Sequence, residues 1–144
     1  MRAVIQRVKN ADVKVDGKTI GEIDRGLLVL LGVGPDDTTK NADELLKKVC
    51  NLRIFRDENE KMNLSVKDID GEILVVSQFT LYADCQKGNR PFINAAPPEK
   101  ANELYEYFKA QCAKEVKHVG SGIFGADMKV SLLNDGPVTI ILEK

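Results

Sequence analysis

Near the end of the chain, residues 134–139 read Asn-Asp-Gly-Pro-Val-Thr and lie between two segments in which apolar and polar residues alternate. Alternation is typical of strands with one buried face, and Asp-Gly between two such segments is a strong hairpin signal. The sequence therefore predicts a hairpin whose strands cover residues 128–132 and 138–142. A proline directly after the glycine removes a backbone donor and stiffens the turn. Alternatively, such a rigid tip, poor in side chains, could form one wall of a binding site and limit which substrates fit.

The rest of the hydrophobic pattern predicts more strands than helices. Residues 26–33 form a continuous apolar run, typical of a strand buried on both faces, and residues 73–82 give the strongest strand prediction. Strands are also expected at residues 1–8, 11–15, 19–23, 52–55 and 116–119, and helices at residues 38–51 and 98–114. Residues 83–97 are expected to form a long loop, which in a compact domain is usually functional or disordered. The pattern predicts a mixed α/β fold with a substantial antiparallel part, as a single domain over residues 1–144.

Charge and composition argue against several classes of protein. The net charge is −1, which counts against a protein that coats nucleic acid nonspecifically but leaves room for a local basic patch. The longest apolar run, residues 27–31, is far shorter than the roughly 20 residues of a membrane span. Three cysteines, Cys50, Cys85 and Cys112, have no metal-binding spacing and fit free thiols in a reducing cytosol. We therefore expect a cytoplasmic protein.

Conventional catalytic motifs are weak in this chain. Residues 120–125 match the dinucleotide pattern G-x-G-x-x-G, but a strand rather than a helix is expected to follow, which excludes a Rossmann site. The stretch is a plain loop, or a loop that brings Phe124 close to a ligand. His118 is the only histidine, so a histidine-rich metal site is excluded and a Ser-His-Asp triad would depend on it alone. Cys85 would need neighbouring cations to become reactive. We expect no metal and no cofactor.

Residues 77–80, Ser-Gln-Phe-Thr, place hydroxyl and amide groups where an apolar strand leaves the core. Strand ends are common positions for groups that bind ligands. Period-two alternation puts Gln78 and Thr80 on one face, with Ser77 on the other, unless a bulge intervenes. The segment is therefore either part of a binding site or a strand whose second half faces water.

Two segments together resemble a known family. Residues 77–82, Ser-Gln-Phe-Thr-Leu-Tyr, and residues 134–139 resemble the two signature motifs of the D-aminoacyl-tRNA deacylases, also called D-tyrosyl-tRNA deacylases. Further stretches resemble the family in the same order along the full length, at residues 1–8, 88–92, 95–98 and 122–128. The resemblance implies a three-layer α/β/β arrangement with largely antiparallel or mixed sheets and two main helices. It also implies a homodimer with the active site at the dimer interface.

The resemblance further implies how one subunit would test the substrate of its partner. The Gly136-Pro137 peptide would be cis and would reach into the partner's pocket. Its carbonyl oxygens would leave no room for the side chain of an L-aminoacyl group, whereas a D residue or glycine would fit. Arg7 would support this chiral filter.

The remaining implied roles concern the pocket itself. Four residues would line the pocket and hold the aminoacyl ester, with backbone N–H groups steadying its carbonyl oxygen: Ser77, Gln78, Phe79 and Thr80. Three others would border the terminal adenine through apolar contacts: Ala96, Phe124 and Met128.

The implied reaction is hydrolysis of the ester between a D-amino acid, or glycine on a non-cognate tRNA, and the terminal ribose of tRNA. Two routes are open: Thr80 attacks as a nucleophile, or the neighbouring 2′-hydroxyl of the tRNA assists a water molecule. We favour the second route, because no residue is obviously placed to deprotonate Thr80. A tRNA 3′-end binding module without catalysis, and a hydrolase of another ester that uses Cys85 or Thr80, are the alternatives.

Overall fold

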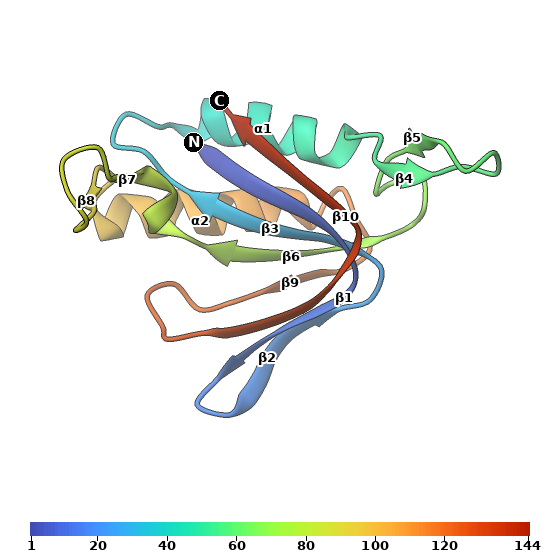
Figure 1. The fold of residues 1–144 in the computed structure, drawn as a ribbon, viewed down its shortest axis with the longest axis horizontal. Coiled ribbons are helices and arrows are strands. Elements are labelled where there is room, and N and C mark those ends of the chain that lie inside the picture. Colours follow the sequence, from blue (N-terminus) through green and yellow to red (C-terminus); the bar gives the residue numbers. More distant parts are fainter.

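One strongly bent sheet of six strands organises the fold (Figure 1), which a computed structural model describes for residues 1–144. The strand order is β10-β1-β3-β6-β9, and β2 pairs with the second half of β1. Neighbouring strands are antiparallel except in the parallel pairs β3–β6 and β6–β9. The strands of this sheet are β1 (Arg2–Val15), β2 (Lys18–Ile23), β3 (Gly26–Gly32), β6 (Glu72–Ser77), β9 (Val119–Ser121) and β10 (Lys129–Glu143).

Two helices cover one face of the sheet, α1 (Thr39–Asn51) and α2 (Pro98–Cys112). At the start of α1, the backbone N–H of Thr38 donates to the side-chain oxygen of Asn41 at 2.8 Å, as in a capping box. Pro98 occupies the first turn of α2, where its missing N–H costs nothing. Both helices were expected from the sequence, and both are confirmed. Neither has the length and apolarity that a membrane crossing requires.

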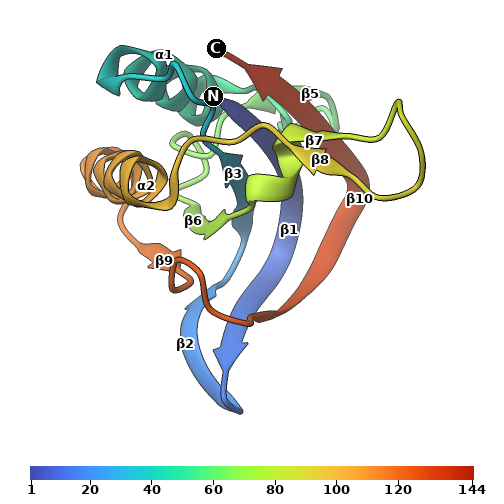
Figure 2. The same ribbon diagram turned by 90° about the vertical axis from the view of Figure 1, so that its left-hand side faces the viewer.

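The structure has two apolar cores, one on each face of the sheet. In β6, Ile73 and Val75 face the helices, whereas Leu74 and Val76 face a smaller core where the sheet bends over itself. This alternation explains why the β6 sequence is apolar without a break. Figure 2 shows the helices on one side of the sheet and the β1–β2 end curling away on the other. The mixed fold with helix, sheet and folded-over sheet layers confirms the predicted α/β class.

The predicted C-terminal hairpin is wrong. Residues on both sides of the Asp-Gly pair belong to one strand, β10, which runs antiparallel to β1. The register moves from the pair Gln6–Thr139 to the pair Val8–Asn134, so β10 uses three more residues than β1 between these points. Residues 135–138, the four that stand opposite the single residue Arg7, bulge out of the strand and are called the Gly-Pro corner below. The Gly136-Pro137 peptide is cis.

Several other boundaries differ from the predictions. The strand expected at residues 73–82 ends at Ser77 and is followed by a 3₁₀ turn, η1 (Phe79–Tyr82). The strand stops because its neighbour β3 ends at Gly32, and the Gln78 N–H makes a last bond to the Leu31 carbonyl at 2.8 Å.

Four smaller corrections complete the fold. The expected loop 83–97 contains a small hairpin of β7 (Ala83–Asp84) and β8 (Phe92–Ile93). The strand expected at 52–55 begins only at Phe55, as β4 (Phe55–Arg56) paired with β5 (Met62–Leu64). The strand expected at 116–119 is β9, which begins at Val119, and the strands expected at 1–8 and 11–15 are the single strand β1.

Candidate functional site

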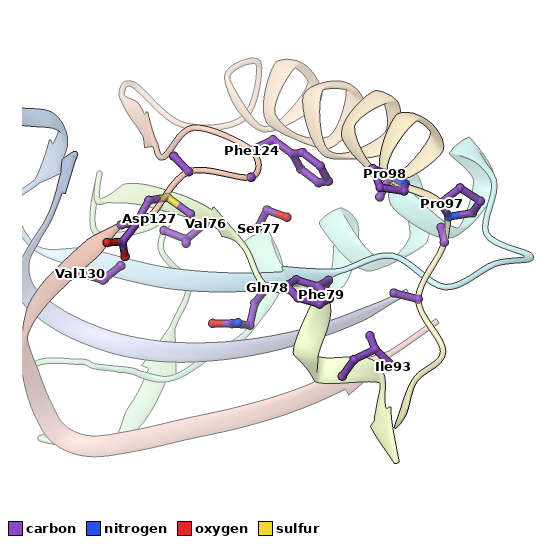
Figure 3. Close-up of a pocket in the computed structure, with 16 residues that line it drawn as sticks. Val76, Ser77, Gln78, Phe79, Ile93, Pro97, Pro98, Phe124, Asp127 and Val130 are labelled. Atoms are coloured by element: carbon purple, nitrogen blue, oxygen red, sulfur yellow. The ribbon is translucent and has the colours of Figure 1, made fainter. Parts of the chain in front are cut away.

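A cavity of about 730 Å³ opens where β6 ends (Figure 3). Ten of its sixteen lining residues are hydrophobic. Its floor is formed by residues 76–79, one side by residues 93–101 at the start of α2, and the other side by residues 124–130 before and within β10. Ligand pockets in proteins typically have this size and this mainly apolar lining with a few polar groups.

The structure brings most of the residues singled out in the sequence to this cavity. Six of them line it, from segments far apart in the chain: Ser77, Gln78, Phe79, Ala96, Phe124 and Met128. Thr80 lies beside the lining rather than in it, and its Oγ1 accepts a hydrogen bond from Gln78 Nε2 at 2.7 Å. Gln78 and Thr80 therefore meet as expected, but through the 3₁₀ turn and not through the period of a strand.

The 3₁₀ turn that follows the cavity floor does not pair all of its own backbone donors. The first bond within η1 is from the Leu81 N–H to the Gln78 carbonyl at 3.2 Å. The N–H groups of Phe79 and Thr80 precede it and have no partner within the turn. Free backbone N–H groups at a cavity edge can bind an oxygen atom that carries negative charge.

No acid, imidazole or amine contacts the hydroxyl group of Thr80. Its side-chain hydrogen bond is to the Gln78 amide, which does not act as a base. His118 lies just before β9, and its Nε2 is 2.9 Å from the Glu22 carbonyl, away from the cavity. Cys85 is exposed and outside the cavity lining, and Cys50 and Cys112 are buried. No cluster of three histidine, cysteine or acidic side chains is arranged to hold a metal ion.

The far side of the cavity depends on a close contact between a glycine and a methionine. A Cβ atom at Gly122 would overlap the Sδ atom of Met128, so only glycine lets that side chain lie where it does. Phe124 lies across the cavity from Gln78 and Phe79 in Figure 3. Its ring centroid is 6.2 Å from that of Tyr105, and burial raises the pKa of Tyr105 to about 12.

The Gly-Pro corner is held by Arg7, whose side chain is only 4% exposed. Arg7 Nε donates to the Asp135 carbonyl at 2.8 Å, and Nη1 donates to the Ile54 carbonyl at 2.5 Å. A Cβ at Gly136 would come within 2.8 Å of the Arg7 guanidinium, and the φ angle of Gly136 is +136°. Gly136 and Pro137 are themselves exposed.

Within one chain, the corner does not reach the cavity. Strand register aligns Ser77 with Leu31 of β3, and Leu31 with Ala3 of β1. Arg7 and the corner lie four residues further along β1, which is roughly 13 Å at the rise of a strand. The corner is also on the edge strand β10, three strands away from β6.

The sequence reasoning missed several members of the cavity wall. Ile93, Pro97, Pro98 and Ala101 line it beside Ala96. For Pro97 and Pro98 the signal in the sequence was the run of alanine and proline at residues 95–98, because such small and rigid residues leave room next to a helix start.

Comparisons with known proteins agree with one another. A family model described as D-Tyr-tRNA(Tyr) deacylase matches residues 4–143. The chain is 60% identical over 144 residues to a D-aminoacyl-tRNA deacylase of Thermosipho africanus, covering 99% of this chain and 97% of the relative. It is 62% identical over 144 residues to the D-aminoacyl-tRNA deacylase of Geotalea daltonii, covering 99% of this chain and 96% of the relative.

Two solved structures share the fold. The structure of a c-Myc DNA Unwinding Element Binding Protein aligns with a TM-score of 0.95 and 46% identity, over 100% of this chain and 99% of that one. The structure of a probable eukaryotic D-amino acid tRNA deacylase aligns with a TM-score of 0.85 over 99% and 98%, and at 17% identity it supports the fold alone.

Proposed function

Because this chain belongs to the D-aminoacyl-tRNA deacylase family, as its two motifs indicated, we propose that it hydrolyses the ester bond of D-aminoacyl-tRNA. The products would be free tRNA and the D-amino acid, which would be kept out of translation. The main structural support is the cavity at the end of β6, because residues 77–79 of the first motif form its floor.

The terminal adenosine of the tRNA would occupy the apolar part of the cavity. Phe124 and Met128 offer an aromatic ring and a polarisable thioether on one side, and Ala96 leaves space on the other. Proteins commonly bind single-stranded RNA ends by stacking an unpaired base on such side chains. This arrangement would place the ribose and its ester near residues 77–80.

The backbone N–H groups of Phe79 and Thr80 would stabilise the reaction. During hydrolysis the ester carbonyl oxygen gains negative charge, and donors that are already in place stabilise that charge at no cost of reorganisation. Ser77 and the Gln78 side chain would orient the aminoacyl group at the same edge of the cavity.

Water activated by the 2′-hydroxyl of the tRNA is the favoured route. A threonine nucleophile needs a base to take its proton, and the only side chain bonded to the Thr80 hydroxyl is an amide. Thr80→Ala should therefore keep activity within about tenfold of the wild type. A loss of more than about a thousandfold, with normal folding and tRNA binding, would support the nucleophile instead.

Chiral selection would come from the Gly-Pro corner of a second copy. The corner is exposed and too far from its own cavity to touch the ester, so in this proposal it would act on the pocket of a partner in a homodimer. Exposed apolar side chains on the same edge strand, Leu133 (53%) and Ile141 (73%), fit a surface that another chain covers. The corner would exclude L-aminoacyl groups and admit D residues, and it would also admit glycine, so glycyl-tRNA is a second expected substrate.

Hydrolysis of tRNA charged with D-tyrosine, L-tyrosine and glycine tests this proposal. We expect release of D-tyrosine and glycine, and no release of L-tyrosine above the rate without protein. Equal cleavage of the D and L esters would contradict the filter. Binding of D-tyrosyl-tRNA without any shortening of its lifetime would favour the alternative function, a non-catalytic module for tRNA 3′ ends.

The oligomeric state tests the filter separately. Sedimentation should give twice the chain mass of 15.9 kDa. A monomer that still rejects the L ester would rule out a corner supplied by a partner. The cytoplasmic location remains a prediction from the sequence.

A further inference from the structure

Tyr105 lies under the cavity, and its hydroxyl group joins the segments that form the cavity walls. It belongs to α2 and is 1% exposed. Its hydroxyl donates to the Val75 carbonyl at 2.9 Å and lies 3.4 Å from the Gly122 carbonyl. Val75 comes two residues before Ser77 on the floor, and Gly122 comes two residues before Phe124 on the side wall.

The Val75 carbonyl is the point at which the side wall leaves the sheet. Besides Tyr105, it accepts the N–H of Gly122 at 3.2 Å. Pairing between β6 and β9 ends at Ser121, and the next residues turn away to carry Phe124 and Met128 along the cavity. One oxygen atom therefore anchors the floor, the side wall and, through Tyr105, the helix.

The ring of Tyr105 also contacts the side wall. It packs against the Phe124 ring, with centroids 6.2 Å apart and planes at 45°. The Lys109 ammonium group, from the same helix, lies 5.6 Å from its centroid. Helix α2 starts at Pro98, and Pro98 and Ala101 line the cavity opposite Phe124, so movement of Tyr105 changes the distance between the walls.

We propose that the Tyr105 hydroxyl is a positioning group that sets the width of the cavity and thereby its affinity for the terminal adenosine of tRNA. The inference rests on the proposed function, in which the adenine lies against Phe124. Tyr105 is not a catalytic residue, because it is buried behind Phe124 and outside the cavity lining. Its loss should weaken binding and leave the chemical step unchanged, since residues 77–80 keep a second anchor in the bond from the Gln78 N–H to the Leu31 carbonyl.

Tyr105→Phe and Tyr107→Phe form a matched pair for the test. Both remove one hydroxyl from α2, but the Tyr107 hydroxyl donates to Asp43 at 2.8 Å on the side of the helix that faces α1. Titration with adenosine 5′-monophosphate gives a Kd, and hydrolysis of D-tyrosyl-tRNA gives KM and kcat. For Tyr105→Phe we expect Kd and KM to rise about three- to tenfold, the net effect of one hydrogen bond, with kcat within about twofold. Tyr107→Phe should leave all three unchanged.

Each other outcome identifies which idea fails. Unchanged Kd and KM in Tyr105→Phe, or equal changes in both variants, would overturn the positioning role of Tyr105. The proposed function would still stand if the wild type hydrolyses the ester. A fall in kcat alone would also overturn it, and so would a Tyr105→Phe chain that does not fold, because the hydroxyl would then serve the whole fold. A wild type that binds the nucleotide without hydrolysing the ester would refute the proposed function, and the Kd values would still decide the role of Tyr105. No nucleotide binding by the wild type would overturn the adenosine assignment.

Discussion

Arg7 attaches the Gly-Pro corner to the rest of the fold, and we expect Arg7→Met to reduce stability and chiral selectivity together. The guanidinium donates to the Asp135 carbonyl at 2.8 Å and to the Ile54 carbonyl at 2.5 Å. Methionine matches the apolar length of arginine but has no donor. Both carbonyls would lose their partner, and the corner would lose its link to the segment after α1.

The magnitude follows from the burial of the two carbonyl groups. Leaving a buried acceptor unpaired costs about 1–3 kcal/mol. Ile54 is 6% exposed and Asp135 is half-buried. The unpaired Ile54 carbonyl should therefore cost close to the upper end of this range, and the unpaired Asp135 carbonyl should cost less. The Asp135 carboxylate is 3.8 Å from Arg7 and 33% exposed, and it adds little. The sum is about 3 kcal/mol, or a fall in Tm of roughly 10 °C for a chain of 144 residues.

Urea unfolding measures the free energy, and Arg56→Met is the matched control. Arg56 is an exposed arginine that pairs with Glu60 at 3.5 Å, so its replacement should change the free energy of unfolding by less than about 0.5 kcal/mol. In the same preparations, the ratio of D- to L-tyrosyl-tRNA hydrolysis should fall about tenfold for Arg7→Met, because in the proposed filter a corner that shifts by a fraction of an ångström would no longer exclude the L side chain.

Two results would refute parts of this reasoning. A destabilisation below about 1 kcal/mol would show that the two carbonyl bonds do not hold the corner. If the free energy of unfolding falls by about 3 kcal/mol and the ratio of D to L hydrolysis is unchanged, Arg7 has the structural role described but the corner is not a filter.

Three further predictions concern other parts of the molecule. Gly122→Ala should raise KM about fivefold, because the new Cβ would push Met128 into the cavity, and an unchanged KM would contradict that packing. Asp37→Asn should lower the free energy of unfolding by about 3 kcal/mol, since the buried carboxylate accepts from the terminal ammonium group at 2.8 Å and a backbone N–H at 2.6 Å; Asp36→Asn, its exposed neighbour, is the control in urea unfolding. Burial raises the pKa of Tyr105 to about 12, so the folded state holds this proton more tightly than an unfolded chain, in which tyrosine titrates near 10. The wild type should therefore lose stability between pH 10 and 12 by an amount that Tyr105→Phe does not show, and parallel pH profiles would contradict this.

The sequence by itself determined the elements whose signals are local. Helix α1 lies within the predicted range 38–51, with Thr38 as its capping residue, and its apolar side chains Leu45, Leu46 and Val49 are buried. Helical hydrogen bonds and helical periodicity both lie within one segment, so they can be read from it. The apolar runs of β3 and β6 also identified buried strands, because a strand covered on both faces needs apolar residues at successive positions.

Partner strands decided where strands end. The Asp-Gly pair is a good turn sequence, but β1 is 14 residues long and offers a continuous partner to both flanking segments, so they form one strand with a corner in it. The segment after Ser77 has strand-like alternation, yet β3 ends at Gly32, and beyond the bond from the Gln78 N–H to the Leu31 carbonyl it offers no further strand partner. A strand needs hydrogen bonds from another segment, and a local pattern does not contain the length of that segment.

For the candidate site, too, the sequence predicted one part and only the tertiary structure decided the other. The two motifs indicated the family, and together with the other resembling stretches they indicated the residues of interest. Tertiary structure alone brought Ala96, Phe124 and Met128 to the floor formed by Ser77, and placed the Gly-Pro corner at the far end of the sheet from it. These distances depend on pairing and burial between segments up to more than a hundred residues apart, and that is the physical reason why they could not be read from any one stretch of the chain.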